Sequence, residues 1–270
     1  MNDVFTKTRI PRPKSQTVPT PAALVDYCDT LLSADEFKDY CPNGLQVDTG
    51  KPIEHLIAGV TACQALIDQA IEHKAQAILV HHGYFWKGEA QPLTGMKGKR
   101  IQSLYENGIS LIAYHLPLDA HPELGNNRAL ADLLDLTITG ALHPDQKHSV
   151  GNIASSAPIA ADELAQKIAN ALGRAPTHIA ADDPKRTLKK IAICTGGAQD
   201  MIEQAALMGC DAFISGEISE RTTHMAREMG VDYFAAGHHA TERGGVMRLA
   251  DRIADQFGIK TQFIDINNPA

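Results

Sequence analysis

Residues 57–83, IAGVTACQALIDQAIEHKAQAILVHHG, decide the fold class of this chain. Two short apolar runs, 53–60 and 77–80, enclose a segment with helical periodicity, 64–73. Two β runs that are joined by a helix of about ten residues require a crossover connection, and such connections join parallel strands. The stretch therefore predicts an α/β unit built on a parallel sheet.

The same alternation continues along the 270 residues of the chain. It predicts an α/β fold with two α/β/α lobes and mostly parallel sheets. We expect the first lobe at 21–139 and the second at 140–270, with 140–188 as a candidate subdomain. Residues 1–20 combine prolines with basic and hydroxyl side chains, so we expect a flexible N-terminal arm there.

A second stretch resembles the first. Residues 191–217 read IAICTGGAQDMIEQAALMGCDAFISGE, with the same order of strand, small-residue turn, helix and strand. In the next unit, ENGISLIAYH (106–115) parallels EMGVDYFAAGH (228–238). Common α/β periodicity explains part of this likeness, but two successive matching units favour an internal duplication that made two related lobes.

The repeat has a chemical consequence. Each copy ends its third strand with a histidine that is followed four residues later by a carboxylate: His115 and Asp119, then His238 and Glu242. Functional groups in open α/β sheets gather at the carboxyl ends of the strands. Two such ends that meet in a cleft between the lobes would bring these side chains together.

The composition excludes several classes of protein. Hydrophobic residues make up 44% and the formal net charge is −7, which argues against a broad nucleic-acid-binding surface. No run approaches the ~20 apolar residues of a membrane helix. The five cysteines are scattered and odd in number. That pattern predicts a reducing, cytoplasmic location and buried, inert thiols.

Three short motifs carry candidate metal ligands. His81 and His82 directly follow an apolar strand, and Gly83 lets the backbone turn. Adjacent side chains on a strand point to opposite sides, so this pair serves two ions more easily than one. Taken alone, the pair is a weak signal for metal and is better explained as two histidines on a polar loop.

The second motif, HLPLDAHPELGNN (115–127), places Asp119 between two histidines; a turn-stabilising aspartate is the alternative. The third, GHHATERGG (237–245), puts His238 and Glu242 at the start of a helix, where a capping glutamate is the alternative. Together the motifs predict a site of imidazole and carboxylate ligands. This chemistry suits two divalent ions of Zn, Fe, Mn, Co or Ni.

At these residues the chain resembles a known family. HHGYFW (81–86), HLPLDAHPELGNN (115–127), SGEISERTTH (215–224) and GHHATERGG (237–245) are similar to the signatures of the NIF-three-like family, also called GTP cyclohydrolase 1 type 2 homologues. The resemblance extends from Pro21 to Ile266. It implies a two-part α/β fold, a dinuclear metal centre in the cleft between the parts, and a toroidal homohexamer.

The resemblance also implies the metal ligands, which fall on His81, His82, Asp119, His238 and Glu242. One division puts His82 and Asp119 on one ion and His81 and His238 on the other, with Glu242 as a bridge. His115 would then orient a ligand or handle a proton.

Several other residues have two explanations each. Tyr84, Phe85 and Trp86 either stack on a nucleobase or pack a loop. Glu217 and His224 are candidate acid–base groups or members of a solvated helix start. The basic residues of 97–100 either meet a phosphate or line an exposed helix face.

Two functions follow from the predicted site. The first is a metal-dependent hydrolase that acts on a small molecule such as a nucleotide, because two ions with open coordination positions can activate water. The second is a metal-stabilised ring that acts as an adaptor or metal-handling protein without catalysis. The expected partners are copies of the chain itself and a small-molecule substrate, with no membrane and no nucleic acid.

Overall fold

The computed structural model describes residues 17–181, 183 and 185–270. Most of the expected N-terminal arm, 1–20, lies outside these residues. The chain forms two compact units. The first comprises the described residues up to Leu118 and those from Gly245 to Asn267, and the second comprises Asp119–Gly244 and Asn268–Ala270.

The first unit contains a five-stranded sheet in the order β1-β4-β3-β2-β11. Its strands β4, β3, β2 and β11 run parallel, and β1 pairs antiparallel with β4 at the edge. The elements of this unit are α1 (Pro21–Leu32), a 3-10 turn (Ala34–Glu36), β1 (Gly44–Val47), β2 (His55–Thr61), α2 (Gln64–Glu72), β3 (Ala77–His82), α3 (Gly95–Asn107), β4 (Ser110–Ala113), α4 (Leu116–Asp119, ending at the unit boundary), α10 (Arg243–Phe257, beginning at the boundary) and β11 (Lys260–Phe263).

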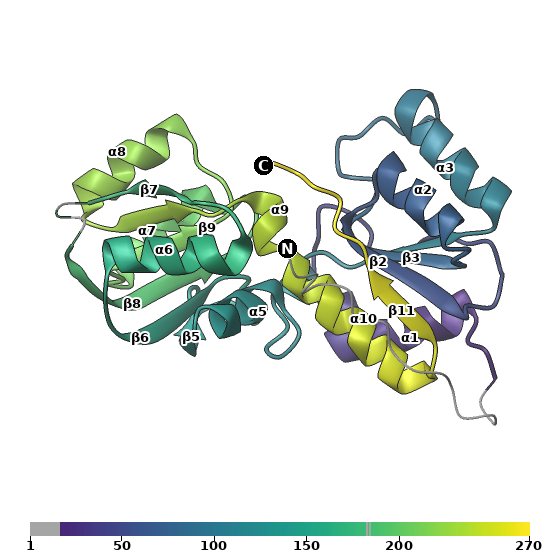
Figure 1. The fold of residues 1–270 in the computed structure, drawn as a ribbon, viewed down its shortest axis with the longest axis horizontal. Helices are drawn as coiled ribbons and strands as arrows, with labels where there is room; N and C mark the ends of the chain where they lie inside the picture. Colours follow the sequence, from purple (N-terminus) through teal and green to yellow (C-terminus); the bar gives the residue numbers. More distant parts are fainter. Residues whose placement is uncertain (1–16, 182, 184) are drawn as a thin grey trace. The chain divides into compact units, whose positions relative to one another are not determined.

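Helices cover both faces of this first sheet. Apolar residues of α2 and α3, such as Leu66 and Leu104, pack against Ile57, Ile78 and Leu111 of the central strands. Helices α1 and α10 lie on the opposite face (Figure 1). The central strand β3 is buried along its length until its last residue, as expected for a parallel strand between two helical layers.

The second unit contains a six-stranded sheet in the order β5-β6-β8-β9-β10-β7. Helices α5 and α6 pack on one face and α7 and α8 on the other. Its elements are α5 (Asn126–Leu133), β5 (Thr137–Ala141), β6 (Asn152–Ala160), α6 (Ala161–Leu172), β7 (Thr177–Ile179), β8 (Thr187–Cys194), a 3-10 turn (Gln199–Met201), α7 (Ile202–Leu207), β9 (Ala212–Ser215), α8 (Glu220–Met229), β10 (Asp232–Ala235) and α9 (His238–Thr241).

The expectation of mostly parallel sheets is met in the first unit and is wrong in the second. Strands β8, β9 and β10 are parallel, whereas β5–β6, β6–β8 and β10–β7 are antiparallel pairs. The connection between β5 and β6 contains no helix, so the two strands pair antiparallel, as short connections require. Strands β6, β7 and β8 of the candidate subdomain 140–188 pair within this one sheet, β6 with β8 and β7 with β10.

The chain divides at different positions from those expected. The first unit ends at Leu118 rather than at residue 139, and residues 245–267 return to it. The reason is the parallel pairing of β11 with β2, which adds the last strand to the edge of the first sheet. Local periodicity predicts that a strand exists but carries no information about which sheet it joins.

No helix in the described part of the chain combines the length and the apolar character that a membrane crossing needs.

Candidate metal centre

The carboxyl end of β3 supplies two histidines in the first unit. His81 is fully buried, and its Nδ1 donates to the carbonyl oxygen of Tyr114 at 2.8 Å. His82 Nδ1 lies 3.3 Å from Thr61 Oγ1 at the end of β2. Although neighbouring side chains on a strand alternate in direction, the centroids of the two imidazole rings are only 4.7 Å apart. The pair is therefore close enough to serve one ion or two adjacent ions.

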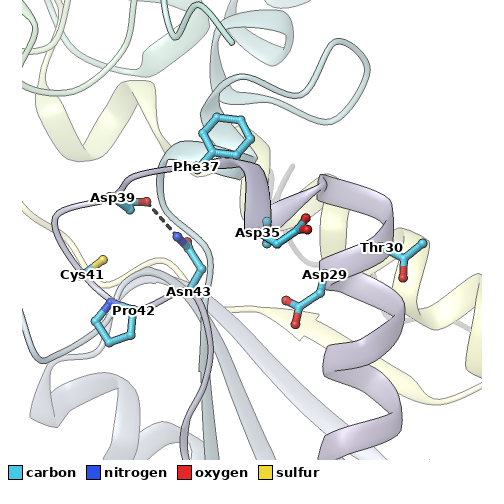
Figure 2. Close-up of a pocket in the computed structure, with 9 residues that line it drawn as sticks. Asp29, Thr30, Asp35, Phe37, Asp39, Cys41, Pro42 and Asn43 are labelled. Carbon is cyan, nitrogen blue, oxygen red and sulfur yellow. Dashed lines mark hydrogen bonds between the residues drawn. The ribbon is translucent and has the colours of Figure 1, made fainter. Parts of the chain in front are cut away.

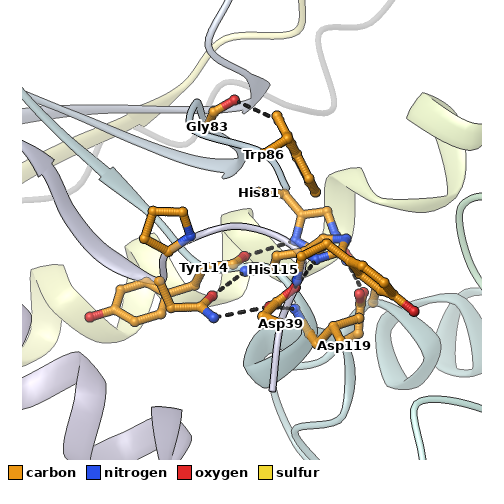
Figure 3. Close-up of polar contacts among 12 residues, drawn as sticks. Asp39, His81, Gly83, Trp86, Tyr114, His115 and Asp119 are labelled. Carbon is orange, nitrogen blue, oxygen red and sulfur yellow. Dashed lines mark hydrogen bonds and ion pairs between the residues drawn. The ribbon is translucent and has the colours of Figure 1, made fainter. Parts of the chain in front are cut away.

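His115 joins this pair from the end of β4 (Figure 3). Its ring centroid lies 5.0 Å from that of His81 and 5.7 Å from that of His82. One ligand nitrogen from each of the three side chains falls within 4.8 Å of the other two. The three side chains form a histidine cluster in which the nitrogens are spaced closely enough for metal coordination.

Asp39 fixes the orientation of His115, and sequence reasoning missed it. Asp39 Oδ1 accepts from His115 Nδ1 at 2.7 Å, and Oδ2 accepts from Leu116 N and Asn43 Nδ2, both at 2.9 Å. Burial raises the pKa of Asp39. Hydrogen bonds from His115, Asn43 and the Tyr40 backbone outweigh that effect and hold the pKa below its ordinary value. The residue is thus a carboxylate that accepts a hydrogen bond from His115 Nδ1.

Asp39 also lines a cavity of about 500 Å³ inside the first unit (Figure 2). Asp29 and Asp35 add two more carboxylates to its wall, and Phe37 and Cys41 add an aromatic ring and a thiol. Burial, with a further contribution from Asp39, raises the pKa of Cys41 to about 12, so this thiol stays protonated at neutral pH.

The second unit holds His238 and Glu242 at the two ends of α9. His238 Nδ1 donates to Glu217 Oε1 at 2.7 Å, and its Nε2 lies 3.2 Å from Glu242 Oε2. Burial lowers the pKa of His238, but Glu242 and Glu217 outweigh burial and raise it to about 9. Glu242 itself is buried, and the backbone leaves space for it only because residue 196 is glycine: a Cβ there would lie 2.1 Å from Glu242 Oε1.

Asp119 is the first residue of the second unit. Its Oδ1 accepts from Asn126 Nδ2 at 2.7 Å. Burial, then the charges of Asp119 and Glu242, raise the pKa of the Cys194 thiol. The neighbouring His121 stabilises a turn, because its Nδ1 accepts from two backbone N–H groups, those of Glu123 and Leu124.

The histidines share a pattern of hydrogen bonds. In His81, His115 and His238, Nδ1 donates to a carbonyl or carboxylate oxygen. In the neutral form of such an imidazole, Nε2 carries the lone pair; in His238 the two carboxylates instead favour the protonated form, with Nε2 facing Glu242. Histidines that bind metal ions nearly always hold their second ring nitrogen in this way. The donor set therefore fits divalent metal ions by its chemistry as well as by its residue types.

Of the other candidates, Tyr84 and Lys97 make contacts within the fold, and His224 is exposed. Tyr84 is buried, and its hydroxyl donates to the carbonyl oxygen of Ala62, so it packs the loop. Lys97 pairs with Glu89 at 3.5 Å and is no exposed phosphate contact. His224 is exposed and pairs only weakly with Glu220, at 3.4 Å.

A comparison with known proteins identifies the family. The family model of Duf34/NIF3 (NGG1p interacting factor 3) matches residues 20–269. The chain belongs to the Duf34/NIF3 family.

This Duf34/NIF3 protein matches its relatives over nearly their whole length. A GTP cyclohydrolase 1 type 2 homolog of Vibrio cholerae is 52% identical over 88% of this chain and 94% of that protein. One of Pseudomonas aeruginosa is 48% identical, over 92% and 98%. Among solved structures, the protein ybgI, of unknown function, matches with a TM-score of 0.89 and 44% identity, over 93% of this chain and 100% of that one.

The five expected metal ligands are divided between the two units of this Duf34/NIF3 chain. His81 and His82 lie in the first unit, together with His115, and Asp119, His238 and Glu242 lie in the second. Asp39 and Glu217, which hold the histidines, were not predicted in that role. Their signal in the sequence is weak, because Asp39 is 76 residues away from His115 along the chain.

Proposed function

We propose that this protein is a hydrolase that depends on two divalent metal ions and acts on a small molecule. The observation that carries the proposal is the histidine cluster: one ligand nitrogen each of His81, His82 and His115 lies within 4.8 Å of the other two. In His81 and His115, Nδ1 donates to an oxygen of the protein, as is usual in histidines that bind metal.

The proposed ligands are His81 and His82 from the first unit and Asp119, His238 and Glu242 from the second. In this proposal these five residues would hold the two ions. Support comes from the mixture of neutral nitrogens and anionic oxygens, which suits Zn, Fe, Mn, Co or Ni. Five protein ligands for two ions leave positions for water and substrate.

When bound, two such ions supply Lewis-acid stabilisation of negative charge on the substrate and a water-derived nucleophile at neutral pH. The protein supplies orientation and proton handling. Asp39 holds His115 with its proton on Nδ1, so His115 Nε2 is the atom that would accept a proton from water or return it to a leaving group. Glu217 gives His238 the same fixed orientation in the other unit.

The reaction that fits these groups is hydrolysis of an ester, an amide or a ring C–N bond. The relatives bear the name GTP cyclohydrolase 1 type 2 homolog, which supports a nucleotide as the class to test first. Family resemblance further supports a toroidal homohexamer. The free cysteines of the described chain fit a cytoplasmic location.

The test combines metal analysis with activity. The purified protein, loaded in turn with each of the five metals, should contain two ions per chain by elemental analysis. His81→Ala and Glu242→Gln should each lower this number, and His224→Ala, an exposed histidine of the second unit, should leave it unchanged. Loaded protein should hydrolyse at least one member of a panel of nucleotides, phosphoesters and amides.

The same experiment separates catalysis from the adaptor role. Glu242→Gln that keeps assembly and melting temperature but loses turnover supports the hydrolase. Loss of assembly in that variant, with no turnover by the wild type on any panel, supports a metal-stabilised ring. A wild-type protein that takes up none of the five metals contradicts both.

A further inference from the structure

The loop that follows the two histidines of β3 is held in place at several points. The side-chain amide of Gln46 accepts from Tyr84 N at 2.7 Å and donates to Tyr84 O at 3.2 Å. Glu89 Oε2 accepts from the backbone N–H of both Phe85, at 2.8 Å, and Trp86, at 3.1 Å. This density of side-chain to backbone bonds gives residues 83–89 one defined conformation.

Phe85 lies in the left-handed region with φ of 67°, which disfavours any residue with a Cβ. Strain of this kind persists where the surrounding structure enforces it, and it concentrates at functional sites. Here the strained residue directly precedes Trp86. The loop geometry therefore serves to place that side chain.

Trp86 lies against the histidine cluster. Its Nε1 donates to Gly83 O at 3.1 Å, which fixes the ring from within the loop (Figure 3). Its ring centroid is 5.0 Å from that of His115 and 5.8 Å from that of His82. The side chain is half-buried rather than part of the core, whereas its neighbour Tyr84 is buried.

A second aromatic ring lies beside the same histidine. Tyr40 follows Asp39, and its ring centroid is 6.5 Å from that of His115. Its backbone N–H donates to Asp39 Oδ1, and its carbonyl accepts from Lys87 N at 2.7 Å, so the Tyr40 segment is tied to the Trp86 loop. Despite these backbone anchors, 62% of Tyr40 is exposed. The Tyr40 side chain thus stands on a backbone that is held by hydrogen bonds, and most of the residue is exposed.

We propose that Trp86 and Tyr40 form an aromatic binding site for the planar nitrogen heterocycle of the substrate, such as a nucleobase, next to His115. The inference rests on the proposed function, and it names the chemical class on which the metal centre acts. Aromatic side chains bind such rings by stacking, which tolerates differences between bases because every base has a π face. The ring would thereby be held beside the imidazoles, as positioning of a reacting group requires.

Trp86 is the single tryptophan of the chain, so its fluorescence reports directly on this site. The four common ribonucleosides, titrated into the full-length protein with and without Zn²⁺, should include at least one that quenches the emission in a saturable way. Ribose, which shares the sugar and lacks the planar ring, should not quench it.

Variants locate the binding. By calorimetry, Trp86→Leu and Tyr40→Leu should each weaken nucleoside binding roughly tenfold or more, because the stacking contribution of a base is about that large. Trp86→Phe, which keeps an aromatic face, should weaken it less. Tyr105→Leu removes a similarly exposed tyrosine on α3 and should leave affinity unchanged. Since Tyr40 is exposed, its variant remains informative even where a Trp86 variant fails to fold.

Failure of this inference is distinguishable from failure of the metal centre. Protein that binds Zn²⁺ while no nucleoside quenches Trp86 overturns the aromatic site alone. Nucleoside binding that is as strong in Tyr40→Leu and Trp86→Leu as in the wild type also overturns it. Nucleoside binding that both variants weaken, in protein that takes up no Zn²⁺, supports the aromatic site and contradicts the metal proposal.

Discussion

Replacement of Asp39 by asparagine should destabilise the protein more than any other single Asp→Asn or Glu→Gln substitution near the histidines. Four donors point at this carboxylate: Tyr40 N at 2.6 Å, His115 Nδ1 at 2.7 Å, and Leu116 N and Asn43 Nδ2 at 2.9 Å. Two of these donors bond to Oδ1 and two to Oδ2. The asparagine amide has only one oxygen, so its NH₂ group must face one of these two pairs of donors.

The size of the effect follows from that count. Two hydrogen bonds are lost, and each buried donor that is left unsatisfied costs about 1–3 kcal/mol. Only 3% of the Asp39 side chain is exposed, which limits how far water can replace the lost acceptor. We therefore expect a loss of roughly 2–6 kcal/mol in the free energy of unfolding, and a fall in melting temperature of roughly 5–20 °C.

Chemical denaturation followed by circular dichroism measures this difference, with Asp35→Asn as the control. Asp35 lines the same cavity but is exposed, so its variant should stay within about 0.5 kcal/mol of the wild type. The pH dependence adds a second check. Because the folded pKa of Asp39 is below its ordinary value of 3.8, its stabilisation is present above that pH and is lost as the pH falls through the folded pKa.

The gap between wild type and Asp39→Asn should accordingly narrow in acid below about pH 4. Two results would refute the reasoning: a variant as stable as the control at pH 7, or a gap that stays constant down to the acid limit of the folded protein.

Three further perturbations have definite expectations. Glu217→Gln should weaken metal binding about 10–100-fold in a chelator competition, with little change in melting temperature because Glu217 is half-exposed; unchanged affinity would contradict its role in holding His238. Gly216→Ala should destabilise the fold strongly, since a Cβ there would lie 2.6 Å from a backbone oxygen, whereas Gly140→Ala, which has open space, should not; equal melting temperatures would argue against this geometry. Burial lowers the pKa of His55, so the free energy of unfolding of the wild type should decline as the pH falls below 6.5. Urea titrations at several pH values should show a smaller decline in His55→Asn; an equal decline in both proteins would contradict this role of His55.

The positions of His81 and His82 could be predicted because a local pattern determines them. An apolar run of strand length ends at His81, and a strand end in an α/β sheet delivers side chains to a functional edge. The division of the candidate ligands into histidines and carboxylates was also readable from the motifs. These features depend on neighbours within a few residues, where sequence and structure are most tightly coupled.

The residues that orient the histidines could not be predicted in the same way. Asp39 reaches His115 only after β1 pairs with β4, and nothing in the composition of either segment specifies that pairing. Likewise, the antiparallel strands β5 and β6 alternate poorly in burial, so the polarity pattern of residues 137–141 resembles that of a loop. Long-range pairing, rather than local preference, decides both cases.

The return of the final strand to the first sheet affects the order in which the protein can mature on the ribosome. Strand β2 is synthesised early, yet its partner β11 is completed only at Phe263, after residues Asp119–Gly244 of the second unit have been made. Until β11 has been made, the β2 edge of the first sheet lacks its partner strand, and an unpaired strand edge can pair with other chains. A chaperone that protects this edge during translation, or slow release of the C-terminal residues, would have a direct effect on the yield of native protein.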